Sequence, residues 1–284
     1  MSIMKENEIA FNKSLGQNFL IDEEVLDKIA SDVVASDGIL EIGAGLGVLT
    51  NKLLKETDNV VAIEFDRKLA EYLKRTTKAK IIQDDVLKVD LDSIIRENDI
   101  NRIIANLPYY ITSPIIMLIL EELSPVGNHP DAFGVTPPRE GNCIDSAKLM
   151  VQWEVGKRIV ADEGSKDYGI LSIACQYYAE CEMLFKVPSS SFLPAPKVDS
   201  SVIELKMRER PIVSSEKDDF FRLVKAAFGQ RRKTFVNSVS NILCIDKTIV
   251  QKAILDIGKA ENVRAEQLSI EEFDKLTQIL FNKR

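Results

Sequence analysis

Ile39-Leu40-Glu41-Ile42-Gly43-Ala44-Gly45-Leu46-Gly47 is an apolar run followed by three glycines at alternate positions. The aliphatic residues predict a buried strand over 39–42, and the glycines permit a tight turn whose backbone a ligand can approach closely. The amphipathic stretch 48–55 then predicts a helix whose first amide groups would face the same ligand. The order of strand, turn and helix therefore predicts an α/β fold with a ligand at the turn. Dinucleotide-binding proteins use similar turns, so this one does not by itself identify the ligand.

Apolar runs and amphipathic stretches continue to alternate further along the chain. More strands are predicted over 59–64, 80–83, 102–105 and 148–151. Helical stretches such as 67–75 lie between them, which implies right-handed crossovers and a parallel sheet with helices on both faces. Two later runs, 181–187 and 201–207, are joined by the proline-rich connector 188–196. We therefore expect the sheet to close with an antiparallel pair.

From residue 214 onward the periodicity is helical only. Short helices are predicted over 218–228, 232–243, 248–255 and 270–281. We therefore expect a sheet domain over 1–210 and a small all-helical domain over 211–284. Residues 188–284 carry 17 Lys and Arg against 13 Asp and Glu, although the whole chain carries 37 against 44. A basic C-terminal part and an acidic front indicate different partners, with chance drift in surface composition as the alternative.

Composition excludes several classes of protein. The chain has 284 residues, 45% hydrophobic and 29% charged, and no run approaches the roughly 20 apolar residues that a membrane helix needs. Its first eight residues lack the pattern of a secretory signal, and its four cysteines have no CxxC spacing, so we expect reduced thiols in the cytoplasm. The single histidine, His129, argues against a histidine-based metal centre and against a Ser-His-Asp hydrolase. We expect no metal cofactor.

Acidic residues end the second and third predicted strands. Glu64 lies where a carboxylate can accept both hydroxyls of a ribose, as in NAD or S-adenosylmethionine binding. Asp85 can accept a hydrogen bond from an adenine amino group, or it can cap the next helix instead. The carboxyl ends of parallel strands meet at one edge of the sheet, where open α/β sheets bind ligands.

The fourth strand ends in Asn106-Leu107-Pro108-Tyr109. An exocyclic amine on a nucleobase is a poor nucleophile because its lone pair is delocalised into the ring. The Asn106 side-chain oxygen and the Leu107 backbone carbonyl can both accept from such an amine, which frees that lone pair. Pro108 fixes the local φ and adds no competing donor, while Tyr109 offers a face for stacking a base. The alternative is a proline turn with a packed tyrosine.

Residues 14–237 resemble the KsgA family of ribosomal RNA adenine dimethyltransferases, with the Erm antibiotic-resistance methyltransferases as near relatives. The resemblance depends on the glycine turn, Glu64, Asp85, residues 106–109 and four further motifs. These are Ser14-Leu15-Gly16-Gln17-Asn18-Phe19-Leu20, Lys166-Asp167-Tyr168-Gly169, Phe192-Leu193-Pro194-Ala195-Pro196-Lys197-Val198-Asp199-Ser200 and Phe228-Gly229-Gln230-Arg231-Arg232-Lys233-Thr234.

The resemblance implies a fold, a reaction and a partner. The fold is a seven-stranded, Rossmann-like, S-adenosylmethionine-dependent methyltransferase sheet with a helical C-terminal domain. The reaction transfers two methyl groups from S-adenosylmethionine to each of two adjacent adenines in the terminal hairpin of small-subunit rRNA. The enzyme would be a cytoplasmic monomer that acts on a partly assembled small ribosomal subunit, with no membrane partner.

The resemblance also implies roles for individual residues. The cofactor would be held by Asn18, Leu20, Gly43, Gly45, Glu64, Asp85 and Asn106. Tyr109 and Phe192 would enclose the flipped target base, with a buried structural role as the alternative for Phe192. RNA contacts would come from Lys225, Arg231, Arg232 and Lys233, and Lys13, Lys157 and Arg158 would extend this basic track.

Two features depart from the family pattern. Residues 124–143 form an insertion with four of the ten prolines, and we expect it to lie at the sheet edge opposite the active site and to tolerate deletion. Trp153 stands where the family commonly has lysine, which puts one basic contact in doubt.

Three rival functions remain: an Erm-type enzyme for large-subunit rRNA, a non-catalytic assembly or transcription factor on the same fold, and an NAD dehydrogenase. The dehydrogenase would have no use for residues 106–109.

Overall fold

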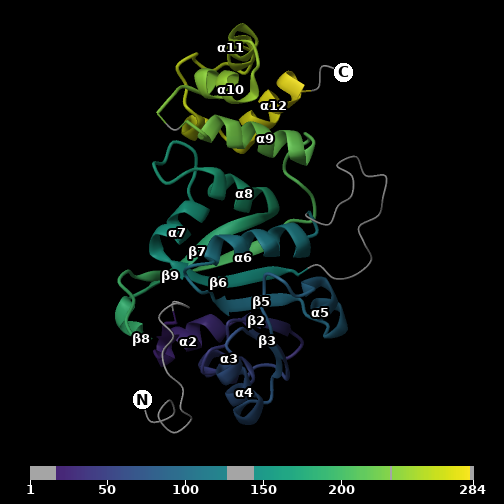
Figure 1. Cartoon of the computed structure of the whole chain (residues 1–284), viewed down its shortest axis with the longest axis vertical. Helices are drawn as coiled ribbons and strands as arrows, with labels where there is room; N and C mark the ends of the chain where they lie inside the picture. Colours follow the sequence, from purple (N-terminus) through teal and green to yellow (C-terminus); the bar gives the residue numbers. More distant parts are fainter. Residues whose placement is uncertain (1–16, 127–143, 231, 282–284) are drawn as a thin grey trace. The chain divides into compact units, whose positions relative to one another are not determined.

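The structure is a computed structural model that describes residues 17–126, 144–230 and 232–281. Their contacts divide into two units (Figure 1). The first contains residues 17–126, 144–156 and 179–209, and the second contains 157–178 and the described residues from 210 onward. Residues 157–178 thus group with the C-terminal helices, whereas we expected a boundary at 211. That boundary stays a prediction about independent domains.

Seven strands form one mixed sheet in the described part of the first unit, in the order β4-β3-β2-β5-β6-β9-β7 (Figure 1). Their bounds are β2 (Gly38–Ile42), β3 (Asn59–Glu64), β4 (Lys80–Gln83), β5 (Arg102–Asn106), β6 (Ser146–Gln152), β7 (Ala179–Val187) and β9 (Ser200–Met207). The strands from β4 to β6 pair in parallel. β9 pairs antiparallel with both β6 and β7, which confirms the expected sheet.

Helices of the first unit follow the strands. Their bounds are α2 (Glu23–Ala30), α3 (Val48–Leu53), α4 (Arg67–Thr76), α5 (Leu91–Glu97) and α6 (Thr112–Leu118), followed by a π-helical turn (Ile119–Leu123). α7 (Trp153–Ile159) begins in this unit and ends in the second. Side chains of α2 and α3 pack in one core cluster with residues of β2, β3, β5, β6 and β9. All five residues of β2 are buried, as expected for a central strand.

A second, very small sheet joins two distant segments. β1 (Phe19–Leu20) pairs antiparallel with β8 (Phe192–Leu193), with Phe19 opposite Leu193 and Leu20 opposite Phe192. The Ile21 N–H also donates to the Ser191 carbonyl at 2.9 Å. This pairing holds the N-terminal segment against the proline-rich connector and was not predicted from the sequence.

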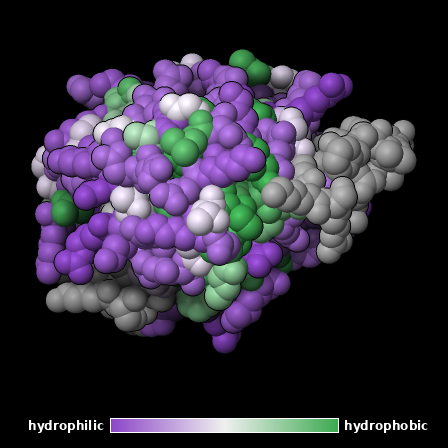
Figure 2. Space-filling model, turned by 90° about the horizontal axis from the view of Figure 1, so that it is seen from above, coloured by the Kyte–Doolittle hydropathy of each residue, from purple (hydrophilic) through white to green (hydrophobic). Residues whose placement is uncertain are grey.

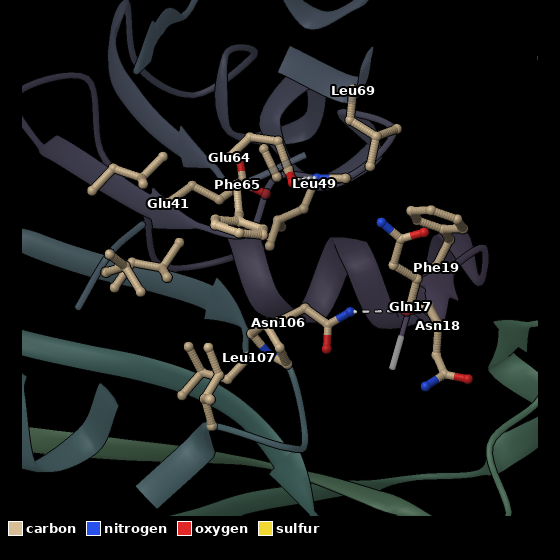
Figure 3. A pocket seen from close by; sticks show the side chains of 18 of the residues that line it. Gln17, Asn18, Phe19, Glu41, Leu49, Glu64, Phe65, Leu69, Asn106 and Leu107 are labelled. Carbon is tan, nitrogen blue, oxygen red and sulfur yellow. Dashed lines mark hydrogen bonds between the residues drawn. The ribbon is translucent and has the colours of Figure 1, made fainter. Parts of the chain in front are cut away.

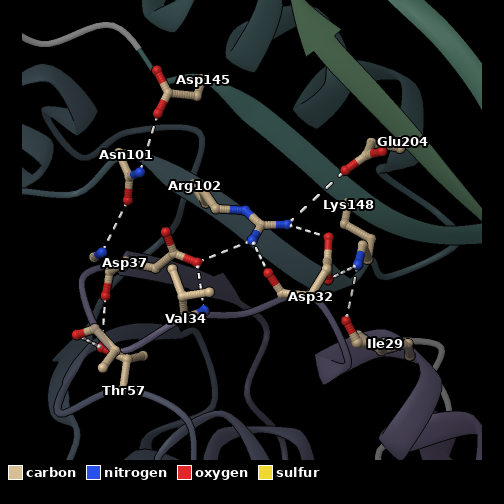
Figure 4. Close-up of polar contacts among 12 residues, drawn as sticks. Ile29, Asp32, Val34, Asp37, Thr57, Asn101, Arg102, Asp145, Lys148 and Glu204 are labelled. Carbon is tan, nitrogen blue, oxygen red and sulfur yellow. Dashed lines mark hydrogen bonds and ion pairs between the residues drawn. The ribbon is translucent and has the colours of Figure 1, made fainter.

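Charged side chains form a network near the amino ends of the strands, in which Arg102, Lys148 and Asp37 are buried and Asp32 is exposed (Figure 4). The Arg102 guanidinium donates to the Asp37 carboxylate at 3.0 Å and to the Asp32 carboxylate at 2.8 Å. Lys148 also pairs with Asp32 and donates to the Ile29 carbonyl at 3.1 Å. Because removal of one member would leave a buried charge without its partner, this network constrains the edge of the sheet opposite the carboxyl ends.

The second unit is helical. It contains α8 (Ile170–Tyr178), α9 (Lys217–Phe228), α10 (Phe235–Leu243), a 3₁₀ turn (Ala265–Gln267), α11 (Lys247–Asp256) and α12 (Ile270–Phe281). Its core is aromatic, with Phe228 stacked on Phe273 at a centroid distance of 6.0 Å. The expected C-terminal helices are present, but α10 begins three residues later than predicted. The Thr234 hydroxyl accepts the Asn237 N–H and so caps the helix at that point.

The surface is mainly hydrophilic on the face drawn in Figure 2, with hydrophobic side chains gathered in limited areas. In the described residues, no helix combines the length and apolar character needed to span a membrane. Within the same ranges, no group of three or more His, Cys, Asp or Glu side chains is placed to hold a metal ion.

Candidate active site

A cavity of about 410 Å³ lies at the carboxyl ends of the parallel strands (Figure 3). It is lined by residues 17–20, 41–46, 63–65, 84–87 and 106–111, together with Val48, Leu49 and Leu69. Every residue expected to hold the cofactor is therefore at this cavity. The N-terminal segment 17–20 reaches it because β1 is anchored to β8.

The glycine turn has the backbone geometry that the sequence predicts. Gly43 and Gly45 have φ values of +78° and +60°, a region that residues with a Cβ rarely adopt. A Cβ on Gly45 would also lie 3.0 Å from the Phe19 ring. Glycine at position 45 is therefore required both for the backbone conformation and for the close approach of the N-terminal segment.

Glu64 connects the glycine turn to the end of β3. One carboxylate oxygen accepts the Gly45 N–H at 2.8 Å and the other accepts the Asp66 N–H at 2.8 Å. The side chain is buried, and burial raises the pKa of Glu64 above its usual value, although these two N–H groups favour the charged form. Each oxygen keeps a second acceptor position, so the carboxylate can still accept from two ligand hydroxyls.

Asp85 lines the cavity and also accepts the Leu87 N–H at 3.1 Å. The sequence left open whether Asp85 binds a ligand or caps the next helix. The helix after β4 is capped by Asp90, whose side chain accepts the Ser93 N–H, so Asp85 does not cap that helix. It stabilises the turn before the helix and leaves its carboxylate at the cavity.

The loop after β5 holds Asn106 in a defined orientation (Figure 3). The Asn106 side-chain N–H donates to the Asn18 backbone carbonyl at 3.3 Å, and the Leu107 N–H donates to the Met150 carbonyl at 3.1 Å. Because its nitrogen donates to the N-terminal segment, the amide presents its oxygen as the atom that can accept a hydrogen bond from a ligand. Asn18 was expected to contact a cofactor, but its contact with Asn106 was not foreseen.

Tyr109 and Phe192 are not brought together at the cavity. Tyr109 lines it, and its hydroxyl lies 2.6 Å from the Ser200 hydroxyl. Phe192 is 2% exposed and packs in the core cluster with Leu20 and Val25, and it is absent from the described residues that line the cavity. The pairing of β8 with β1 places its ring in the core. In this structure Phe192 therefore has the buried position that the sequence left as the alternative.

The expected RNA-binding residues belong to the second unit. Lys225 is exposed on the last turn of α9, and Arg232 and Lys233 are exposed between α9 and α10. Arg231, like Lys13 and most of the insertion 124–143, lies outside the described residues. Lys157 pairs with Asp167 at 3.9 Å, so part of its charge is already neutralised within the protein.

Sequence reasoning missed an apolar rim at the cavity. Phe65 and Tyr110 are each 53% exposed and Leu87 is 39% exposed, and all three line it. Large apolar side chains exposed beside a cavity commonly mark a binding surface. Phe65 and Tyr110 directly follow Glu64 and Tyr109, so their position next to predicted site residues was the signal available in the sequence.

Glu41 is a second buried carboxyl group at the cavity. It is 2% exposed and accepts the Thr50 hydroxyl at 2.5 Å. Burial, together with the nearby Glu64 carboxyl, raises the pKa of Glu41 to about 8, although the Thr50 hydrogen bond opposes the shift. Glu41 is therefore largely protonated at neutral pH. In the sequence, Glu41 could be recognised only as a member of the glycine motif.

Comparisons with known proteins identify relatives over almost the whole chain. The family model described as "Ribosomal RNA adenine dimethylase" matches residues 9–283. The chain is 44% identical over 292 residues to "Ribosomal RNA small subunit methyltransferase A" of Alkaliphilus oremlandii, covering 99% of this chain and 96% of the relative. It is 40% identical to the protein of that name from Clostridioides difficile, covering 99% and 94%.

Solved structures of similar fold agree with these sequence matches. A dimethyladenosine transferase from Plasmodium falciparum is 26% identical with a TM-score of 0.73, covering 93% of this chain and 98% of that one. The 23S rRNA methyltransferase ErmE is 22% identical with a TM-score of 0.62, covering 93% and 99%. At that identity, the ErmE match supports the fold alone.

Proposed function

The chain belongs to the ribosomal RNA adenine dimethylase family, and from this we propose that it dimethylates the N6 amines of two adjacent adenines in the 3′-terminal hairpin of small-subunit (16S) rRNA. The methyl donor is S-adenosylmethionine, and the reaction belongs to late assembly of the small subunit. The observation that carries the proposal is one cavity that holds both the Glu64-bound glycine turn and the Asn106–Tyr109 loop. The glycine turn with Glu64 can bind a nucleoside cofactor, and the Asn106–Tyr109 loop can bind a nucleobase amine.

The residues at the cavity fit S-adenosylmethionine. Glu64 is a buried carboxylate with acceptor positions left for two ribose hydroxyls, and Asp85 can accept from the cofactor's adenine amine. Phe65 and Leu87 offer apolar surface to the adenine ring, and Gly45 lets the Phe19 ring of the N-terminal segment approach the turn. When bound, the cofactor supplies a methyl group that is already activated on its sulfonium. No metal is required for this chemistry.

The protein's part in the reaction is positioning and polarisation. The Asn106 side-chain oxygen and the Leu107 backbone carbonyl accept the two N–H groups of the target amine, which frees its lone pair, while Pro108 stiffens the loop. Tyr109 stacks on the base after it has left the RNA helix, a step that costs a few kcal/mol. No strong general base is needed, because the amine can lose its proton after the transfer. Alignment of the two reacting groups then supplies most of the rate enhancement.

RNA affinity comes from the second unit in this proposal. Lys225, Arg231, Arg232 and Lys233 would contact phosphates, which provide affinity without reading sequence. We place the reaction in the cytoplasm, on a monomeric enzyme that recognises the small subunit and its rRNA. Two alternatives remain: an Erm-type enzyme acting on 23S rRNA and conferring macrolide resistance, and a non-catalytic assembly factor. The names of the sequence relatives favour the small subunit over the first of these.

Methyl transfer from radiolabelled S-adenosylmethionine to undermethylated small subunits, large subunits and free rRNAs tests the proposal. We expect label in small-subunit RNA as dimethyladenosine, and its loss in Asn106→Ala. Label in large-subunit RNA would instead identify an Erm-type enzyme. Absence of label from every substrate, with the cofactor still bound, would identify a protein that kept the fold and lost the reaction.

A further inference from the structure

A hydrogen bond between side chains links the candidate active site to the start of β9, which lies two strands from β5 in the sheet. The Tyr109 hydroxyl lies 2.6 Å from the Ser200 hydroxyl, although the two residues are 91 positions apart in the sequence. Tyr109 lines the cavity, whereas Ser200 is fully buried. The bond therefore runs from a ring at the cavity to a fixed point in the protein interior.

Ser200 is held from both sides by the sheet. It begins β9, where it pairs with Gln152 of β6 and with Val187 of β7. The residue before it is also fixed, because the Asp199 carbonyl accepts the Trp153 N–H at 2.9 Å. The position of the Ser200 hydroxyl is consequently set by backbone pairing.

Tyr109 is different, because backbone bonds fix its loop but not its ring. The Leu107 N–H donates to Met150 and the Ile111 N–H donates to the Pro108 carbonyl at 3.2 Å, on either side of Tyr109. A tyrosine side chain has two further rotatable bonds, and these determine which way the face of the ring points. Burial raises the pKa of the Tyr109 hydroxyl, so it stays neutral and able to donate at physiological pH.

We propose that Ser200 is a positioning residue for methyl transfer, whose hydroxyl holds the Tyr109 ring in the orientation that stacks on the target adenine. The inference rests on the proposed function, because it assumes that Tyr109 contacts a base. The role requires the tyrosine hydroxyl, because a phenylalanine at position 109 would have no group to bond to Ser200. Stacking requires a defined ring plane, so rotation of the ring would misplace the target amine relative to the methyl donor.

The test compares Ser200→Ala with Ser201→Ala. Ser201 is the matched control because it is the next residue of β9 and is equally buried, and because its hydroxyl has no hydrogen-bond partner among the residues that the structure describes. We expect Ser200→Ala to lower kcat on undermethylated small subunits by about fivefold to twentyfold, as loss of one positioning hydrogen bond predicts. The KM for S-adenosylmethionine should stay within about twofold, and Ser201→Ala should match the wild type in both constants.

A double-mutant cycle with Tyr109→Phe separates positioning from a general structural effect. Tyr109→Phe removes the same hydrogen bond from the cavity side, so the variant carrying both changes should be no slower than the slower single variant. Multiplying effects would show that Ser200 acts independently of Tyr109 and would overturn the inference. If Ser200→Ala does not fold, Tyr109→Phe alone tests the inference. An unchanged kcat in Tyr109→Phe would then overturn the inference.

A fluorescent base gives a readout that does not depend on turnover. With 2-aminopurine at the target adenine, stacking on Tyr109 should quench its emission in the wild type and in Ser201→Ala, and less in Ser200→Ala. Equal quenching in all three proteins would contradict the inference while leaving the proposed function intact. A wild type that transfers no methyl group to any ribosomal RNA would instead overturn the proposed function, and this inference with it.

Discussion

Asn106 combines two contacts that only an amide can make together. Its N–H donates to the Asn18 carbonyl, and in the proposed reaction its oxygen accepts from the substrate amine. Asn106→Asp keeps the shape but replaces the donor by an oxygen that is repelled by the Asn18 carbonyl. We expect kcat to fall by about a hundredfold, since a displaced acceptor misaligns the amine. Single-turnover methyl transfer, with cofactor affinity measured by calorimetry, checks this prediction.

Cofactor affinity should change much less than the rate in Asn106→Asp, because Glu64 and the glycine turn keep their mutual hydrogen bond. A variant with unchanged single-turnover rate would contradict the assignment of the Asn106 oxygen as acceptor. Loss of cofactor binding alone would show instead that the contact with Asn18 serves the cofactor site.

Glu41 makes the stability of the protein depend on pH. Its pKa is raised from 4.5 to about 8 in the folded state, so between these values the folded protein keeps a proton that the unfolded chain releases. The free energy of unfolding contributed by this group therefore falls as pH rises from about 4.5 to about 8. Glutamine does not titrate, so Glu41→Gln removes this pH-dependent fall in the free energy of unfolding. It also keeps an oxygen that can accept the Thr50 hydroxyl. We expect the variant to gain stability relative to the wild type across this range.

Urea unfolding at pH 5 and pH 8 measures this difference. The stability of Glu41→Gln minus that of the wild type should be larger at pH 8, by at least about 1 kcal/mol. Glu64 is the other buried carboxyl of the cavity and is retained in both proteins, so it does not by itself create the difference. An equal difference at both pH values would show that Glu41 titrates as it does in the unfolded chain.

At the scale of elements, long periodic segments were predicted and short tertiary pairings were not. The apolar run over 59–64 and the amphipathic pattern over 67–75 correspond to β3 and α4 within one residue. β1 and β8 contain two residues each, too few to produce a periodicity, and they exist because they pair with each other. The sequence therefore located the strand ends that carry Glu64 and Asn106.

The contacts that orient those side chains were beyond sequence reasoning. The Asn18 carbonyl that engages Asn106 and the Ser200 hydroxyl that engages Tyr109 come from segments 88 and 91 residues away. A motif identifies a side chain of suitable chemistry, but its hydrogen-bond partner depends on how the chain has folded. The burial of Phe192 has the same cause, because it depends on the pairing of β8 with β1.

Phe192→Leu distinguishes a core residue from a base-stacking residue in β8. Leucine keeps most of the apolar volume beside Leu20 and Val25 but has no ring to stack on a base. If the ring is a core group, the free energy of unfolding should fall by about 1 kcal/mol and kcat should change by less than about threefold. Thermal unfolding and methyl transfer measured on the same preparation check both values. A large loss of kcat with unchanged stability would favour the stacking role.

At the scale of the whole molecule, the two edges of the sheet have different roles. The carboxyl ends of the strands present the cavity, and the amino ends carry the ion network of Arg102, Lys148, Asp32 and Asp37. The insertion 124–143 connects the π-helical turn after α6 to the amino end of β6. Its point of attachment is therefore on the structural edge of the sheet and away from the cavity.

The described ends of the insertion are already held together. The Ile144 N–H donates to the Leu123 carbonyl at 3.1 Å, and Val126 and Ile144 are both buried. Replacing residues 128–142 by a short Gly-Ser linker keeps these contacts and shortens the loop, which lowers the entropy cost of closing it slightly. We therefore expect Tm to change by less than about 3 °C and kcat on undermethylated small subunits by less than about twofold. A loss of kcat above tenfold at unchanged Tm would show that the insertion contacts the ribosomal substrate, because the fold would be intact and only recognition would have been removed.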